Sequence, residues 1–187
     1  MSSTRTQSYM KTQYIVTSAV IAAIYVVLTL PFGQVAIGPI QFRMAECMAV
    51  LPILTPAAIP GITVGCFLSN LINPQNLGPI DIIFGSLATL FAAVSTAWLY
   101  SVLKNLAAVP RDLICLIPPV VFNALIVGTY LTFLLSRDAT VRVTMILINI
   151  AYLALSELVV VYLIGYPLLI ILRKSGVVRI WKETKNP

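Results

Sequence analysis

The chain has 187 residues, of which 59% are hydrophobic and only 10% are charged. A soluble domain carries roughly 25% charged residues, so this composition excludes a protein that water surrounds on all sides. The net charge of +6 does not indicate nucleic-acid binding, because the basic residues are scattered over the chain ends and the short gaps between long apolar runs. Such runs are typical of bilayer proteins, in which a helix needs about 20 apolar residues to cross.

Six apolar segments are predicted to cross the membrane as helices in one compact bundle. Pro56 and Pro60 interrupt the second and third of these segments, which gives an alternative in which the two form a broken hairpin. The predicted spans in chain order are Tyr14–Leu30, residues 43–56, Ile59–Ile72, Ile80–Leu103, Leu113–Leu135 and Val143–Leu172.

The ends of the chain are predicted to be cytoplasmic tails, residues 1–13 and a basic segment at 174–187, on either side of one membrane domain at 14–173. Met1–Lys11 is polar and no clear cleavage signal follows it, so we interpret it as a tail and not as a removed signal peptide.

Counting basic residues supports this orientation in the cell membrane, because positive charge concentrates on the cytoplasmic side. With six spans the inner side carries nine basic residues and the outer side carries three. The inner residues are Arg5, Lys11, Lys104, Arg111, Arg173, Lys174, Arg179, Lys182 and Lys185, and the outer ones are Arg43, Arg137 and Arg142.

Several polar residues fall at depths where lipid makes them costly, and such residues usually face a cavity or a partner. The predicted topology places most of them in the outer half of the bundle. We therefore expect a pocket that opens to the outside and is lined by carboxylates, amides and tyrosines. The candidates for this pocket are Arg43, Glu46, Asn70, Asp81, Asn123, Tyr130, Asn149, Tyr152 and Glu157.

In the sixth span, Asn149, Tyr152, Ser156 and Glu157 occupy an arc of about 140° at roughly 100° per residue, so they are predicted to share one face. Glu157 is an unpaired carboxylate near the middle of the span. It is the first choice for a ligand contact.

Each candidate also has a purely structural interpretation. Arg43 and Glu46 are three residues apart and can neutralise each other on a helix. Asp81 follows Gly78-Pro79 and can be a first-turn acid that the helix dipole favours. Asn123, like Asn149, can simply join helices by hydrogen bonds.

The first span carries small residues at Ala19 and Ala23, reinforced by Ser18 and Ala22. Small residues four positions apart let helix backbones approach closely in a membrane. The pattern has two interpretations, which are packing inside the bundle and docking to another membrane subunit.

Residues for catalysis or ATP hydrolysis are missing. The sequence has no phosphate-binding G-x-x-x-x-G-K-[ST] loop, and the absence of histidine excludes histidine-based metal sites, Ser-His triads and histidine proton relays. Cys47, Cys66 and Cys115 lie in or beside apolar segments without metal-ligand spacing, so they are interpreted as small buried residues. We expect neither enzyme activity nor a cofactor or metal.

Three motifs resemble the QueT family of queuosine-precursor transporters. They are F-R-x-x-E at residues 42–46, P-A-A-I-P-G at 56–61 and D-I-x-F-G-S-L-A-T at 81–89. The family belongs to the substrate-binding (S) components of energy-coupling factor (ECF) transporters. The resemblance implies the compact six-helix fold of S components, with an outward pocket closed by loops that include Pro31–Phe42.

The resemblance also implies partners and a ligand. The partners are a transmembrane coupling subunit, which docks on an A-x-x-x-A pattern matching Ala19 and Ala23, and two cytoplasmic ATPases. The ligand is a 7-deazaguanine such as preQ0, preQ1 or queuine. A carboxylate can accept both N–H groups of its guanine-like edge, and a second one can pair with the aminomethyl cation of preQ1. We assign the guanine-like edge of the ligand to Glu157 or Glu46. We assign its carbonyl and ring nitrogens to the amides of Asn123 and Asn149. The rings of Tyr130 and Tyr152 are assigned to stacking on the heterocycle.

Three other functions stay open at this point. The chain can be an S component for another heterocyclic vitamin, because the pocket residues are not unique to deazaguanines. It can also be a self-sufficient secondary carrier that uses Glu157 as a proton site. An intramembrane enzyme is the third alternative, although nothing nominates a nucleophile.

Overall fold

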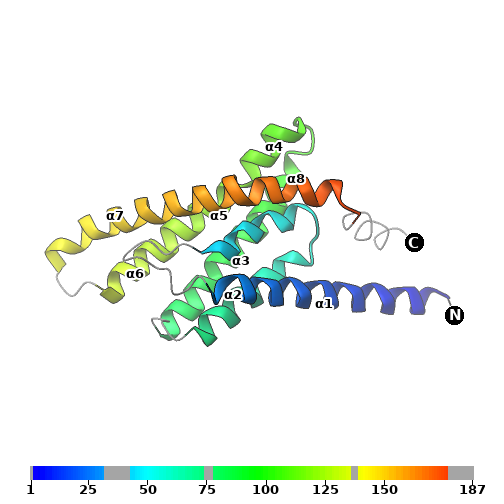
Figure 1. Cartoon of the computed structure of the whole chain (residues 1–187), viewed down its shortest axis with the longest axis horizontal. Helices are drawn as coiled ribbons and strands as arrows, with labels where there is room; N and C mark the ends of the chain where they lie inside the picture. Colours follow the sequence, from blue (N-terminus) through cyan, green and yellow to red (C-terminus); the bar gives the residue numbers. More distant parts are fainter. Residues whose placement is uncertain (1, 32–42, 74–77, 136–138, 177–187) are drawn as a thin grey trace.

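The computed structural model describes residues 2–31, 43–73, 78–135 and 139–176 (Figure 1). Within these ranges every regular element is a helix, which confirms the all-helical class. Four helical stretches are long and apolar enough to cross a bilayer, and they match four of the predicted spans. They are Met10–Thr29, Pro79–Val102, Ala108–Leu134 and Val143–Lys174.

Two shorter apolar helices occupy the positions of the predicted second and third spans. Helix η1, Met44–Ile53, is a 3-10 helix of 10 residues, and α2, Ala58–Ile72, is an α-helix of 15 residues. With a rise of about 2.0 Å per residue in a 3-10 helix and about 1.5 Å in an α-helix, they are roughly 20 Å and 22 Å long. Each is shorter than a hydrocarbon core of about 30 Å, so the count of six spans stays a prediction.

The long spans contain irregular turns that the sequence analysis did not predict. The fifth span is broken at Leu116 and contains a π-helical segment, and the sixth contains a second one. The bounds are α1, Ser2–Thr29; α3, Pro79–Val102; α4, Ala108–Cys115; α5, Ile117–Phe122; η2, Asn123–Val127; α6, Gly128–Leu135; α7, Ala139–Leu158; η3, Val159–Gly165; and α8, Tyr166–Lys174.

The centre of the bundle is η1, which is buried from Ala45 to Ile53. It packs against α1, α2, α3, η3 and α8. Gly165 allows η3 to approach η1 closely, because a Cβ atom there would lie 2.9 Å from the backbone oxygen of Cys47. The 3-10 helix therefore carries its polar residue, Glu46, into the middle of the protein.

Helices α1 and α2 pack through glycines on α2. A Cβ atom at Gly61 would lie 2.9 Å from the Ser18 backbone oxygen, and one at Gly65 would lie 2.6 Å from the Tyr25 Cβ atom. The Ser18 hydroxyl also donates to the Ala57 backbone oxygen at 2.9 Å. Close backbone approach through small residues is the usual way to join membrane helices, and here the glycines of α2 supply it.

Replacing Gly65 with valine is expected to push α1 away from α2. Overpacking of a tight contact typically costs about 1–3 kcal/mol, and the new side chain would meet Tyr25 and the Ala22 backbone. The measurement is the unfolding temperature in detergent, with Val64→Leu at the adjacent exposed position as the control. An unchanged unfolding temperature for Gly65→Val would contradict this packing.

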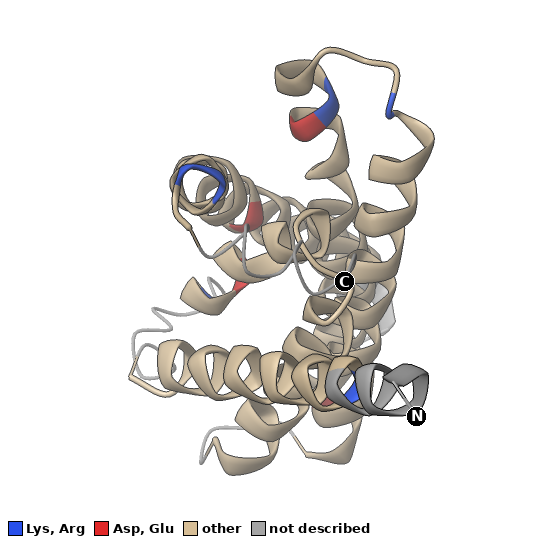
Figure 2. Ribbon diagram, turned by 90° about the vertical axis from the view of Figure 1, so that its right-hand side faces the viewer, with Lys and Arg blue, Asp and Glu red and all other residues tan. Residues whose placement is uncertain are grey.

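Helix α1 begins and α8 ends at the same end of the bundle, and α4 projects from the rest of the fold near that end (Figure 1). Most of the ribbon is uncharged, and a basic and an acidic position adjoin on the projecting helix α4 (Figure 2). The loop expected to close the pocket, Pro31–Phe42, lies outside the described residues from position 32 onward, as does the basic tail after residue 176.

An ion cluster ties α3, α4 and α8 together. Arg173 donates to both oxygens of Asp112, with a distance of 2.9 Å between Nη2 and Oδ1. The Arg111 guanidinium lies 4.3 Å from the ring centroid of Tyr100, and its Nε atom lies 3.8 Å from Asp112 Oδ1. Asp112 is only 2% exposed, so a bidentate charge-assisted bond stabilises it.

Candidate ligand-binding site

One group of polar side chains is centred on Glu46, in the first turn of η1. Its side chain is almost completely buried, although a carboxyl group is costly within a membrane. The hydroxyl group of Tyr25 on α1 donates a hydrogen bond of 2.6 Å to Glu46 Oε1. A buried tyrosine hydroxyl usually finds such a partner, so α1 holds one oxygen of the acid in place.

Asn123 and Glu157 lie close to the same acid. The Asn123 amide lies near the carboxyl groups of both Glu46 and Glu157, and these two carboxyl groups lie near each other. Asn123 is 2% exposed and Glu157 is 5% exposed. Even so, Asn123 Nδ2, Asn123 Oδ1 and Glu157 Oε2 have no partner at hydrogen-bond geometry among the described residues. Buried polar atoms are normally satisfied, so these three atoms are candidates for contacts with a polar ligand.

The backbone positions these two side chains with unusual turns. Asn123 is the first residue of η2, and Glu157 lies two residues before η3. A π-helical turn inserts extra backbone into a helix and is frequent at functional sites. Pro167, just after η3, cannot donate a backbone hydrogen bond, which favours an interruption of the hydrogen-bond ladder in this region.

A second group of polar side chains surrounds Asp81, in the first turn of α3. The Tyr130 hydroxyl donates to Asp81 Oδ1 at 2.5 Å, and Arg43 Nη2 lies 3.7 Å from the same oxygen. Asn70 Nδ2 lies 3.5 Å from the Asp81 backbone oxygen. Gly85 leaves room for these groups, because a Cβ atom there would lie 2.9 Å from Asn70 Nδ2 and 3.7 Å from Arg43 Nη1.

Arg43 joins the two groups. It directly precedes η1, three residues before Glu46, and it acts electrostatically on Tyr25, Tyr130, Glu46 and Glu157. The helices α1, η1, α2, α3, η2, α6 and α7 therefore contribute to one polar cluster. We call it the polar cluster, and its members are Tyr25, Arg43, Glu46, Asn70, Asp81, Asn123, Tyr130 and Glu157.

A family model described as the QueT transporter matches residues 15–174, and this range contains the whole polar cluster. The chain belongs to the QueT transporter family. The family resemblance of the sequence motifs is thereby confirmed. Together with the four helices long enough to span a bilayer, membership identifies a membrane transporter.

A curated relative of this QueT family member is the queuosine precursor transporter QueT of Lactococcus lactis subsp. cremoris (strain MG1363). The two are 42% identical over 82 residues, which is 43% of this chain and 47% of the relative. The match thus spans about half the length of the relative. No solved structure matches the chain.

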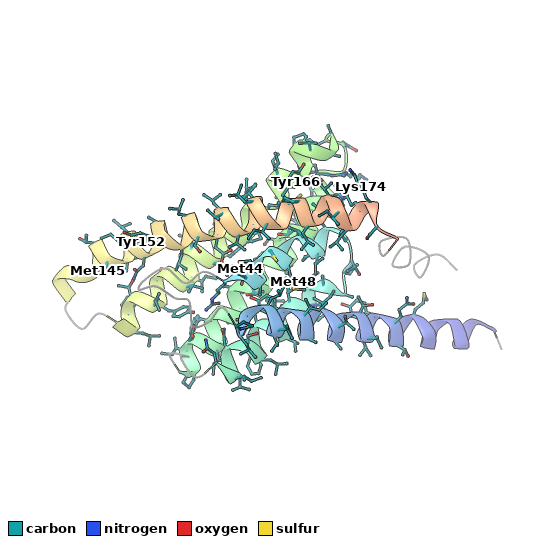
Figure 3. The ribbon with its side chains drawn as sticks, in the orientation of Figure 1. Met44, Met48, Met145, Tyr152, Tyr166 and Lys174 are labelled. Carbon is teal, nitrogen blue, oxygen red and sulfur yellow. The ribbon has the colours of Figure 1, made fainter. Side chains whose placement is uncertain are left out.

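Two predicted site residues of the QueT chain lie apart from the polar cluster. Asn149 Nδ2 donates to Thr132 Oγ1 at 2.8 Å and so joins α7 to α6, which agrees with its structural interpretation. Tyr152 is 42% exposed and lies on α7 toward the end away from the chain termini, whereas Met44 at the start of η1 is central (Figure 3). The polar residues expected on one face of the sixth span therefore have different surroundings. Glu157 lies in the polar cluster, whereas Asn149 lies where α7 packs against α6.

Three residues at the cluster were not predicted from the sequence to belong to a site. Tyr25 and Gly85 were not considered, and Cys66 was interpreted only as a small buried residue. In the structure Cys66 Sγ lies 3.7 Å from Asn70 Nδ2. The available signal was the hydroxyl of Tyr25 in an otherwise apolar span, because a buried tyrosine needs a hydrogen-bond partner.

The two alanines proposed for docking are exposed. Ala19 and Ala23 lie on the outer side of α1, while Ser18 and Ala22 contact α2. The interpretation of Ala19 and Ala23 as packing residues inside the bundle is therefore wrong. Next to them, a groove of about 500 Å³ runs between α1, η1 and α8. It is lined by Val16, Thr17, Val20, Ile21, Ile24, Leu28, Met48, Leu51, Leu168 and Leu172.

Proposed function

We propose that the protein is the substrate-binding subunit of an ATP-driven importer of the ECF type, and that it captures a queuosine precursor from outside the cell. Membership of the QueT transporter family and the name of the curated relative support this substrate. The observation that carries the proposal is the set of unpartnered buried atoms on Asn123 and Glu157. A bound polar heterocycle would satisfy them.

A 7-deazaguanine carries hydrogen-bond donors and an acceptor that complement the carboxyl and amide groups of the polar cluster. Its N1–H and exocyclic amine are donors for one carboxylate, either Glu46 or Glu157, in a charge-assisted pair of hydrogen bonds. The Asn123 amide would donate to the ring carbonyl. Tyr130, whose ring centroid lies 6.2 Å from that of Phe84, is the candidate for stacking on the heterocycle.

We further propose that Ala19 and Ala23 dock on a transmembrane coupling subunit, which two cytoplasmic ATPases drive. Their exposure on α1 and the adjacent apolar groove support a helix–helix contact. Both chain ends would then be cytoplasmic, in agreement with the start of α1 and the end of α8 at the same end of the bundle (Figure 1).

Docking is tested by replacing Ala19 and Ala23 together with tryptophan. Close approach would be blocked, so we expect loss of co-purification with the coupling subunit and unchanged precursor binding. Leu147→Trp, at an exposed position on α7, is the control. A double variant that still assembles normally would contradict this docking surface.

The substrate proposal is tested by purifying the protein from cells that make queuosine precursors and identifying the co-purified small molecule by mass spectrometry. We expect a 7-deazaguanine at about one per protein. A different heterocyclic vitamin would contradict the substrate. Uptake that persists without ATPases and collapses with the proton gradient would contradict the ATP-driven mechanism.

A further inference from the structure

The polar cluster contains more acidic than basic side chains. Three carboxyl groups, those of Glu46, Asp81 and Glu157, face one guanidinium group, that of Arg43. Among the described residues, Arg43 is the basic side chain that acts on both glutamates, and its ion pair at 3.7 Å is with Asp81. An ionised carboxylate inside a membrane bundle is costly unless a positive charge lies beside it, so the cluster suits a guest that brings positive charge.

Glu46, Asn123 and Glu157 together present an ordered pattern of hydrogen-bonding groups. Asn123 lies near both Glu46 and Glu157, and its amide nitrogen and oxygen are both unpartnered among the described residues. We call these three residues the acid–amide–acid set. They offer a carboxylate, an amide N–H donor and a second carboxylate to one ligand.

A 7-deazaguanine with an aminomethyl group at position 7 carries the complementary pattern along one edge. It presents an ammonium group, then the ring carbonyl, then the N1–H and the exocyclic amine. The ammonium group matches one carboxylate, the carbonyl matches the amide N–H, and the two remaining donors match the second carboxylate. A nitrile in place of the aminomethyl group is neutral and only accepts hydrogen bonds, so it leaves one carboxylate unpaired.

We propose that the acid–amide–acid set selects precursors that carry a protonated amine over precursors that are neutral at the same position. This inference rests on the proposed function and adds to it the property by which the site chooses among queuosine precursors. One glutamate recognises the guanine-like edge that all these ligands share. The other recognises only the cation.

The test compares the affinity of the purified protein for three ligands by calorimetry. They are preQ1, which carries the ammonium group, preQ0, which carries a nitrile, and 7-hydroxymethyl-7-deazaguanine, which replaces the ammonium group of preQ1 by a neutral hydroxyl of similar size. A hydrogen bond to a charged group corresponds to roughly tenfold to a hundredfold in affinity. We expect preQ1 to bind tighter than either neutral ligand by about that factor.

Variants then show which glutamate binds the guanine-like edge of the ligand and which binds the ammonium group. Of Glu46→Gln and Glu157→Gln, one is expected to abolish the preference for preQ1 while preQ0 still binds, and the other to weaken all three ligands. Asp112→Asn is the matched control, because it also replaces a buried carboxyl group by an amide but lies in the remote ion cluster with Arg173. It should leave the ratio of preQ1 to hydroxymethyl affinity unchanged.

Equal affinities for preQ1 and its hydroxymethyl analogue in the unmodified protein would overturn the inference and leave the proposed function standing. Failure of all three ligands to bind would overturn the proposed function itself. A preference for preQ1 that survives in both glutamine variants would also overturn the inference. The comparison of ligands needs only the unmodified protein. It therefore tests the preference for a protonated amine even where a variant does not fold.

Discussion

Replacing Asn123 with leucine is expected to stabilise the ligand-free protein and to weaken precursor binding roughly tenfold to a hundredfold. Both polar atoms of the Asn123 side chain are buried and unpartnered among the described residues. An unsatisfied buried polar group costs about 1–3 kcal/mol, and leucine of similar size removes that cost. The ligand, in contrast, loses a hydrogen bond that only the amide provides.

The measurement combines thermal unfolding in detergent without ligand and calorimetric titration with preQ1. Asn149→Leu is the matched control for the sign of the stability change, because it removes the hydrogen bond to Thr132 and is expected to lower the unfolding temperature. If Asn123→Leu also lowers the unfolding temperature, Asn123 joins helices and the ligand assignment is wrong.

Replacing Asp112 with asparagine is expected to destabilise the protein by about 3 kcal/mol, the scale for breaking a buried ion pair. The change removes the charge to which Arg173 donates twice and leaves two guanidinium groups beside Tyr100. Affinity for the precursor should stay within about twofold. Asp81 and Tyr100 are 19 residues apart on α3, or about 28 Å, so this ion cluster is remote from the polar cluster.

Equilibrium unfolding and ligand titration on the same preparation check this prediction. Lys174→Ala, at an exposed neighbouring position, is the control and should change the free energy of unfolding by less than about 0.5 kcal/mol. An Asp112→Asn protein of normal stability would show that the ion pair is not structural. A tenfold loss of affinity would show that the two clusters are coupled.

The apolar periodicity and charge of the sequence were sufficient to predict the long membrane helices. They were insufficient for the 3-10 form of η1 and the two π-helical segments, because such turns depend on tertiary packing. The approach of Gly165 to the Cys47 backbone is one such contact. The apolar periodicity of η1 and of η3 does not predict it.

The residues of the polar cluster were largely anticipated because a carboxylate or amide in an apolar helix is conspicuous. The hydrogen-bond and ion-pair partners of these residues were not predicted. One interpretation paired Arg43 with Glu46, three residues away, and the structure shows an ion pair of Arg43 with Asp81 on α3. Tyr25 was missed because its role depends on which face of α1 meets α2, and Gly61 and Gly65 determine that face.

The most direct test is an experimental structure of the protein with preQ1 bound in a lipid nanodisc. We predict that the heteroatoms of the ligand lie within about 3.2 Å of the side chains of Glu46, Asn123 and Glu157. Density for the ligand elsewhere, with these three side chains packed only against protein, would contradict the central claim.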